Sequence, residues 1–357
     1  IGETVDHLET TVDTVTARAT SGGIYIKETN ALDVSDVTVT VNRVATTGVA
    51  GNGNQTDVLA QAGIVTTAGS NGSIVVVAGG AMTVSNGVIS DGSGNVRTES
   101  TSGSMELSAA HASGSGHITV IAKTNLKQTA LGDISTSGAG TIDVEAGGAI
   151  EMRSGAINSD TAVSGAKDIR YQAKGGNLTL GSFSTGSDGT NGGTVVLIAS
   201  GSIIDGDSEV DVTANKLYMQ SGSTNAIGDG SDHIEISGNT LSLRAGSGGS
   251  FVTESNGVTV DTVALSTLRR VENTSSLTVQ TGSWEDLNAA TTGHIVLVST
   301  AGDIVLNAGT AATNSVTSVA GNILLQTTNS GSITANADVV STSGNISVLA
   351  AQSVTFT

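Results

Sequence analysis

The chain has 357 residues, of which 48 are Gly, none is Pro or Cys, and only one Trp, three Tyr and three Phe are aromatic. Without Pro and a three-residue Gly period it is not collagen, and without Cys it holds no disulfide framework or Cys-ligated zinc site. The formal net charge of −18 repels phosphate backbones, so nucleic-acid binding is not expected. No apolar run approaches the ~20 residues of a transmembrane helix, so no membrane span is expected.

Short segments in which apolar and polar side chains alternate recur along the whole chain. Residues 4–16 are rich in Thr and Val and favour strand, 140–146 (GTIDVEA) is the clearest case, and 210–215 and 333–339 repeat it. A period of two is the pattern of a half-buried strand. Intervening segments such as 90–95 (SDGSGN) are turns, because Gly, Asn and Asp tolerate positive φ. The chain is therefore predicted to be all-β.

A longer repeat lies on top of this alternation. Residues 14–43 match residues 240–269 at an offset of 226. Over the first 24 positions, TVTARATSGGIYIKETNALDVSDV and TLSLRAGSGGSFVTESNGVTVDTV share ten identities. The chain thus contains an internal duplication, with about one and a half copies of a unit near 226 residues long.

Self-similarity of this kind is typical of a solenoid, in which each coil buries its apolar face against its neighbours. At roughly 22 residues per coil the chain predicts about 16 coils, which at ~4.8 Å each form a rod of roughly 75–80 Å. Ladders of Val, Ile and Thr need few aromatic side chains, and a Pro in an interior coil would remove a ladder hydrogen bond. We predict one continuous right-handed parallel β-helix, a β-solenoid, over residues 1–357.

Two strings carry a family resemblance. Residues 72–84 (GSIVVVAGGAMTV) and 293–309 (GHIVLVSTAGDIVLNAG) resemble the coils of filamentous-haemagglutinin-type exoproteins and giant repetitive bacterial adhesins. The resemblance covers nearly the whole chain and is one of texture rather than of a single motif. It implies a right-handed β-helix, export from a bacterium to the cell surface, and a role in adhesion or in filament scaffolding.

The densest cluster of chemically active side chains is acidic and consists of two groups about one coil apart: Asp205, Asp207, Glu209 and Asp211, followed by Asp229, Asp232 and Glu235. In an extended segment, residues spaced by two point to the same face. Stacked coils would then bring carboxylates of the two groups within several Å of each other.

Three interpretations of this acidic region remain open. The simplest is a solvated acidic face. The second is a Ca²⁺ site, since hard cations bind clustered carboxylates, with these candidate ligands: Asp205, Asp207, Asp211, Asp229 and Asp232. The third is the carboxylate pair of a polysaccharide-processing enzyme, for which the candidates are Asp207, Asp211, Asp229 and Asp232.

A few residues outside the acidic region are also candidates for a functional or structural role. Trp284 is a candidate sugar-stacking platform, with packing at a coil corner as its alternative. Arg18 and Glu28 recur in the duplication as Arg244 and Glu254, and an ion pair between neighbouring coils is the simplest expectation for them. The five His are scattered without the spacing of a metal site, and no catalytic motif or resident cofactor is predicted.

We therefore expect a non-enzymatic, extracellular structural or adhesive β-helix that acts as a rigid stalk or filament. The ends, 1–16 and 353–357, are strand-like, which predicts self-association by end-to-end stacking or continuation in a longer repetitive chain. Surface glycans are further expected partners. The alternatives are a β-helical polysaccharide-processing enzyme and a carbohydrate-binding module, the latter if Trp284 lies on an exposed concave face.

Overall fold

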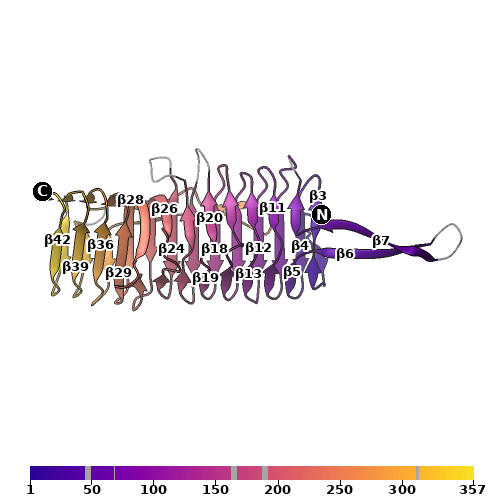
Figure 1. Cartoon of the computed structure of the whole chain (residues 1–357), viewed down its shortest axis with the longest axis horizontal. Helices are drawn as coiled ribbons and strands as arrows, with labels where there is room; N and C mark the ends of the chain where they lie inside the picture. The colour runs from indigo at the N-terminus through magenta and orange to yellow at the C-terminus, as the bar shows by residue number, and fades with distance from the viewer. Residues whose placement is uncertain (45–49, 68, 162–166, 187–191, 311–312) are drawn as a thin grey trace.

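The computed structural model describes residues 1–44, 50–67, 69–161, 167–186, 192–310 and 313–357, with the side chains of 40–60 excepted. Within these ranges every regular element is a β-strand, β1 to β43, and no helix is long and apolar enough to cross a membrane. One sheet has 37 strands, and Figure 1 shows the strands stacked along a rod with the termini at opposite ends. The prediction of an all-β parallel β-solenoid is confirmed.

Three parallel ladders, named A, B and C, form most of the rod. Ladder A runs through β1 (Leu8–Thr10), β4 (Ile24–Glu28), β9 (Ile74–Ala78), β12 (Val96–Ser100), β15 (Ile118–Ala122), β18 (Ile142–Ala146), β21 (Ile169–Ala173), β24 (Thr194–Ala199), β26 (Val212–Gln220) and β28 (Ile234–Ala245). Ladder B runs through β2 (Thr14–Val15), β5 (Leu32–Val34), β10 (Met82–Val84), β13 (Met105–Leu107), β16 (Leu126–Gln128), β19 (Ile150–Met152), β22 (Leu178–Thr179), β25 (Ile203–Ile204) and β27 (Ala226–Ile227). Ladder C runs through β3 (Ala17–Ala19), β8 (Ile64–Thr66), β11 (Val88–Ser90), β14 (His111–Ser113), β17 (Ile134–Thr136), β20 (Ile157–Asp160), β23 (Ser182–Ser184) and the first halves of β26 and β28.

Near β28 the ladders change partners, because this long strand pairs in turn with β29, β30 and β35. Ladder D then runs through β29 (Gly249–Glu254), β36 (Ile295–Ser299), β39 (Ile323–Thr327) and β42 (Ile346–Leu349). Ladder E runs through β30 (Val258–Val260), β37 (Ile304–Leu306), β40 (Ile333–Ala335) and β43 (Val354–Phe356). Ladder F runs through β35 (Leu287–Ala289), β38 (Asn314–Ser318) and β41 (Asp338–Ser341).

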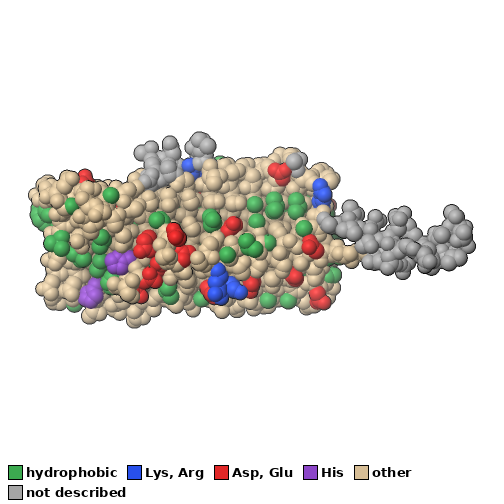
Figure 2. Space-filling model, in the orientation of Figure 1, with side chains coloured by type: hydrophobic (Ala, Val, Ile, Leu, Met, Phe, Trp, Pro, Cys, Tyr) green, Lys and Arg blue, Asp and Glu red, His purple; other side chains and the backbone are tan. Residues whose placement is uncertain are grey.

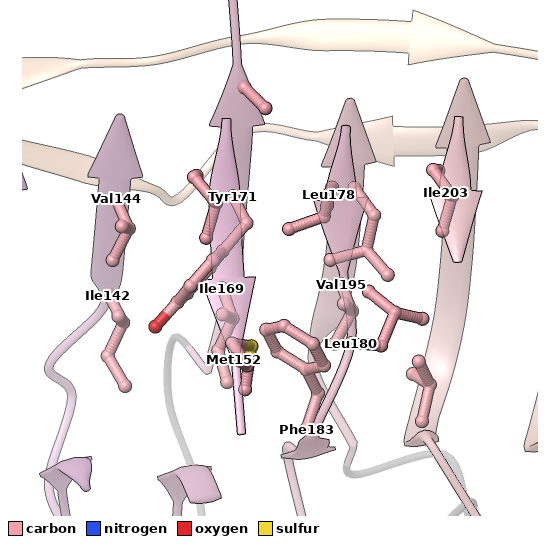
Figure 3. Close-up of a cluster of buried hydrophobic side chains, with 14 of the residues drawn as sticks. Ile142, Val144, Met152, Ile169, Tyr171, Leu178, Leu180, Phe183, Val195 and Ile203 are labelled. Atoms are coloured by element: carbon pink, nitrogen blue, oxygen red, sulfur yellow. The ribbon is translucent and has the colours of Figure 1, made fainter. Parts of the chain in front are cut away.

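The core is a column of stacked aliphatic side chains inside the rod. One inward position of ladder A is occupied in register by Ile24, Ile74, Val96, Ile118, Ile142, Ile169 and Val195. Burial of each such side chain contributes roughly 1.5–3 kcal/mol. Figure 3 shows Tyr171 and Phe183 in the same interior, where their rings meet edge to face at 4.9 Å between centroids. These two aromatics thus serve as core fillers.

Ser and Gly together close many of the turns. At the end of β12, Ser100 Oγ donates to the carbonyl of Gly80 in the preceding coil (2.6 Å) and accepts from Gly103 N (3.1 Å). Ser113 and Gly116 repeat the arrangement at the end of β14. A Cβ on Gly116 would lie 2.1 Å from a backbone oxygen of the coil below, so the close stacking of coils requires Gly there.

The strand pairings of the first copy of the predicted duplication recur in the second copy, with each paired residue shifted by 226 positions. Leu8 pairs with Ile26, and Ile234 pairs with Val252. The next strands repeat the relation at the same offset, with β2 on β5 and the middle of β28 on β30. The two segments therefore form the same local structure.

The structural similarity between the two copies begins before residues 14 and 240, where the sequence match starts. His7 lies against Tyr25 with ring centroids 5.8 Å apart, and His233 lies against Phe251 at 5.9 Å. Each of these residues has its counterpart 226 positions away. The conserved ring pair marks the same point of the unit in both copies.

Two antiparallel insertions leave the ladders. The β6–β7 hairpin follows β5 and consists of β6 (Val37–Val44) and β7 (Ala50–Gln61). The β31–β34 arm follows β30 and consists of β31 (Val263–Leu265), β32 (Arg269–Val271), β33 (Leu277–Val279) and β34 (Gly282–Trp284). Both insertions begin at the same place in the duplicated unit, and their residues add nothing to the length of the coiled rod.

The β31–β34 arm lies lengthwise on the outer side of ladder A. Its strand β31 contacts β24 and β26, and β32 contacts β15 and β18. Arg270 donates to Asp143 (2.7 Å) and to Glu145 (2.8 Å), and Val271 N donates to Thr119 Oγ1 (2.9 Å). The arm thus connects coils that lie far apart along the rod.

Candidate metal centre

The acidic cluster consists of Asp205, Asp211 and Glu235. Asp205 directly follows β25, Asp211 directly precedes β26, and Glu235 lies in β28 one coil further along. Asp211 N donates to the backbone oxygen of Glu235 (2.9 Å), and Glu235 N donates to Asp211 Oδ2 (3.0 Å). The parallel ladder therefore fixes these two carboxylates side by side, and the turn after β25 adds the third. On the face shown in Figure 2, Asp and Glu side chains gather over this part of the rod.

The three side chains converge on a small volume. One carboxylate oxygen from each lies within 4.8 Å of the others. Asp211 is 1% exposed and Asp205 is 8% exposed. Among the described residues, no hydrogen-bond partner reaches Asp205 Oδ2, Asp211 Oδ1 or Glu235 Oε2. Buried carboxylate oxygens without donors are costly unless a proton or a cation accompanies them.

The pKa values of the three carboxyl groups also indicate that the cluster needs a proton or a cation. Burial, followed by the charge of Asp205, raises the pKa of Asp211 to about 9. Burial, again with Asp205 as the main charged neighbour, raises the pKa of Glu235 to about 7, and burial also raises the pKa of Asp205. Carboxylates this close cannot all ionise at neutral pH without a compensating charge.

The donor set suits a hard divalent cation. Ca²⁺ binds six to eight oxygens at about 2.3–2.6 Å, so two of its ligands are at most about 5 Å apart. The oxygens of the acidic cluster meet this limit. Three carboxylates would supply a charge of −3 around the ion, and the remaining ligands would be backbone carbonyls or water.

The structure brings together some of the sequence-predicted ligands and not others. Asp205 and Asp211 meet, and Glu235 joins them. Asp207 does not, because the segment between β25 and β26 is a bend and not the extended strand that the spacing suggested. Its backbone N donates to Asp205 Oδ1 (2.9 Å), and its own Oδ1 accepts from Glu209 N (3.0 Å).

The two remaining candidates lie outside the cluster itself. Asp229 is exposed, and its carboxylate accepts from Ser231 N (2.7 Å), Ser231 Oγ (2.6 Å) and Asp232 N (3.0 Å) within its own turn. These hydrogen bonds, led by those from Ser231, lower the pKa of Asp229. Asp232 is exposed beside the cluster, where its charge helps to raise the pKa of Asp205. Asp232 therefore lies at the mouth of the site.

Trp284 lies on the β31–β34 arm and not at a coil corner. Its ring stacks on Tyr218 of β26, with 4.3 Å between centroids and 9° between planes. It also lines a cavity of about 620 Å³ with Arg244, Asn288 and Thr317. One ring face is thus covered by Tyr218, and the residue anchors the root of the arm.

The recurring Glu residues act differently from the expected ion pair. Glu28 is 1% exposed and accepts hydrogen bonds from Thr10 Oγ1 (2.6 Å), Val12 N (3.0 Å) and Asn30 N (3.1 Å). Although burial alone would raise its pKa, these donors lower it. Glu254 likewise accepts from backbone N–H groups. For Glu28 the ion-pair expectation is replaced by a buried carboxylate that caps a turn.

No protein-family model, curated protein or solved structure matches this chain. The likeness to filamentous-haemagglutinin-type exoproteins thus remains a resemblance of sequence texture. Function has to be inferred from the ladders, the acidic cluster and the arm.

Proposed function

We propose that the chain is a non-enzymatic, extracellular β-solenoid that serves as a rigid stalk, filament or adhesin shaft on a bacterial surface. The observation that carries the proposal is the single 37-stranded sheet that links coil to coil along the rod. Each coil packs on its neighbours through hydrogen-bond ladders and one stacked core. Such a quasi-one-dimensional structure gives length and stiffness rather than an enclosed reaction chamber.

Two features add stiffness to this design. The β31–β34 arm ties β26 to coils near the N-terminal end through a continuous series of contacts, including a hydrogen-bond contact of His7 Nε2 with Asn273 O (3.0 Å). In the acidic cluster, a Ca²⁺ ion would join Asp211 and Glu235 of adjacent coils. Calcium at this position would be a structural clip between coils.

The enzymatic alternative is less well supported by the same geometry. Hydrolysis of a glycosidic bond needs two carboxylates that flank the sugar, and the substrate must reach both. Asp211 is almost completely buried, so a polysaccharide chain has no access to it. The acidic cluster is better suited to a bare ion than to a sugar.

Immunogold electron microscopy of the cells that produce the protein tests the proposal. Label on the outside of intact cells, held away from the envelope, is expected for a surface shaft. A panel of polysaccharides incubated with the chain and with its Asp211→Asn variant provides the control for enzymatic activity. Label confined to the cell interior, or reducing ends released by the wild type alone, would contradict the proposal.

A further inference from the structure

One outward position of ladder A continues from coil to coil into ladder F. The strand pairing places its residues side by side in this order: Gln172, Ile198, Gln220, Arg244, Asn288 and Thr317. We call this series the outer row. All of its members except Ile198 carry an amide, a guanidinium or a hydroxyl group. Because paired strands lie about 4.8 Å apart, the outer row extends over roughly 24 Å of the rod.

Two cavities lie over the outer row and adjoin at Arg244. The first, of about 620 Å³, is lined by the last three residues of the row and by Trp284. The second, of about 530 Å³, is lined by the first four residues of the row. Arg244, Ala245 and Ala290 line both cavities, so the two form one continuous groove. Small-molecule sites are concave surfaces with a few convergent polar groups, and this groove has that form.

The root of the β31–β34 arm provides an aromatic surface beside the outer row. Trp284 stacks on Tyr218 through one face of its ring and lines the groove together with Arg244 and Asn288. Its side chain is only half-buried, so part of the ring is accessible from the groove. The C–H face of a sugar ring packs favourably on the negative face of an aromatic ring.

The polar groups of the outer row have spare hydrogen-bonding capacity. Tyr218 Oη donates to Gln220 Oε1 (2.7 Å), which leaves the Nε2 donors of Gln220 for another acceptor. Asn288 Nδ2 lies 3.5 Å from the backbone oxygen of Glu285, at the limit of a hydrogen bond. In the described part of the chain, no hydrogen-bond or ion-pair partner reaches the side chains of three further members of the row: Gln172, Arg244 and Thr317.

Nearer the N-terminal end of the rod, the same ladder position serves the fold instead. It carries Glu99 and Glu145, two and four coils apart from one another's neighbours in the same series. Glu99 forms an ion pair with Arg97 (2.7 Å), and Glu145 forms ion pairs with Lys174 and Arg270. These carboxylates are bound to cations of the protein itself, whereas the groups of the outer row remain available to a ligand.

The chemistry of the groove selects among polymeric ligands. A phosphate-bearing polymer is disfavoured by the formal net charge of −18. An added peptide strand needs a free backbone edge, but the strands of the outer row have their backbone groups paired within the ladder. A neutral polysaccharide presents hydroxyl groups, which both donate and accept, at every sugar unit. It therefore matches a series of amide, guanidinium and hydroxyl side chains.

We propose that the outer row and Trp284 form a binding groove for a linear, neutral, β-linked polysaccharide that lies along the rod. Arg244 and the amides of Gln220 and Asn288 donate to oxygens of successive sugar units. Trp284 packs on the C–H face of one unit. The inference rests on the proposed function as an adhesin shaft and names the ligand class of that shaft. The polysaccharide is bound and not cleaved.

Fluorescence titration follows binding at the groove itself, because Trp284 is the single Trp of the chain. The probes are cellohexaose, xylohexaose and N-acetylchitohexaose, with the corresponding trisaccharides as length controls and hexagalacturonate as the charged probe. At least one neutral hexasaccharide should shift the Trp emission. It should bind at least about tenfold more tightly than its own trisaccharide, which covers only half of the row, and more tightly than hexagalacturonate. Calorimetry measures each Kd.

Two variants of the full chain assign the binding to the outer row. Arg244→Gln should raise the Kd of the hexasaccharide about tenfold or more, because hydrogen bonds from a charged donor are the stronger ones. Arg18→Gln is the matched control, since Arg18 is the exposed counterpart 226 positions earlier and pairs in its ladder with Val65. The double variant Gln172→Ala, Thr317→Val should weaken hexasaccharide binding and preserve trisaccharide binding.

Three results would overturn the inference: no binding of any neutral hexasaccharide, binding of hexagalacturonate alone, or equal effects of Arg244→Gln and Arg18→Gln. Each of them would leave the shaft function standing, because immunogold labelling of intact cells does not depend on the ligand. Label confined to the cell interior would contradict the shaft function and leave the measured Kd unchanged. Circular dichroism of every variant identifies any that has lost the β-solenoid.

Discussion

Buried carboxylates in this rod occur in two opposite environments. Glu28 is surrounded by hydroxyl and backbone donors, which lower its pKa against the effect of burial. Asp211 shares its pocket with other carboxylates, and burial together with Asp205 raises its pKa to about 9. The same functional group therefore stabilises the fold as an anion at one position and requires a proton or a cation at the other.

Glu28→Gln should destabilise the chain by about 1–3 kcal/mol at pH 7, because hydrogen bonds to a charged acceptor are the stronger ones. A carboxylate with a lowered pKa contributes stability above its unfolded pKa, and this contribution is lost as pH falls through the folded value. Urea unfolding of both chains should therefore give curves that converge as the pH drops below about 4.5. The exposed Glu9→Gln is the control, and an equal effect at the two positions would contradict the assignment.

Calcium should stabilise the chain more at pH 8.5 than at pH 5. Raised carboxyl pKa values mean that, without metal, stability falls as pH rises from about 4 through the folded pKa values near 7 and 9. Ca²⁺ binds the deprotonated carboxylates, so its stabilising effect on the folded chain grows as the protons dissociate. The effect reaches about 2.7 kcal/mol at a Ca²⁺ concentration of 100 Kd. Thermal unfolding in CaCl₂ and in EDTA measures the difference.

Asp211→Asn should abolish most of this calcium-dependent shift, and the exposed Asp229→Asn should preserve it. Asp229 is held by its own turn and lies outside the acidic cluster. Equal loss in both variants would point to a diffuse acidic face. Absence of any shift in the wild type would show that the cluster holds protons instead of an ion.

At the scale of elements, the strands were predictable and the arm was not. Alternation such as Ile142, Val144 and Ala146 fixes which side of a strand is buried, whichever neighbour it pairs with. The arm residues Val263 and Leu265 alternate in the same way, yet they pair antiparallel and pack on the outside of the rod. The local sequence pattern therefore predicts only that one side of a strand is buried. Whether that side faces the core or packs on the outside of the rod depends on contacts with coils that are distant in the sequence.

For the acidic cluster, too, the sequence pattern predicted one part of the arrangement and not another. The offset of 24 residues between Asp211 and Glu235 correctly suggested carboxylates in adjacent coils, because the coil period is a property of the sequence. The expectation for Asp207 failed, because its side chain bonds the backbone and bends the segment. Hydrogen bonding within a turn competes with the extended geometry that a spacing of two assumes.

Arg270→Ala should loosen the β31–β34 arm. Its guanidinium binds Asp143 and Glu145, and Asp143 is fully buried with Arg170 as its other cation. Removal of one partner from a buried carboxylate should cost about 1–3 kcal/mol here, since the second Arg remains. Hydrogen exchange by mass spectrometry should show faster exchange over residues 263–284.

Arg269→Ala is the matched control for this variant. The neighbouring guanidinium donates to the backbone oxygen of Thr267 (2.9 Å) on its own arm and pairs with no carboxylate among the described contacts. Its loss should leave exchange in the arm close to that of the wild type. Similar acceleration in both variants would show that the ion pairs to the coils do not hold the arm in place.

At the scale of the molecule, the ladders, the core and the arm all run along one axis. Coils contribute stability through their interfaces with neighbours, so the rod should resist bending while remaining as thin as a single coil. The acidic surface, with its formal net charge of −18, keeps such rods soluble. Length and stiffness are the properties that this sequence specifies most clearly.

Negative-stain electron microscopy of the native material tests that claim most directly. A rigid shaft predicts straight particles of uniform width, a few nanometres across, with contour lengths that exceed the length of a single rod when copies are joined. Single compact particles, or chains of short segments that bend freely at their junctions, would contradict the account.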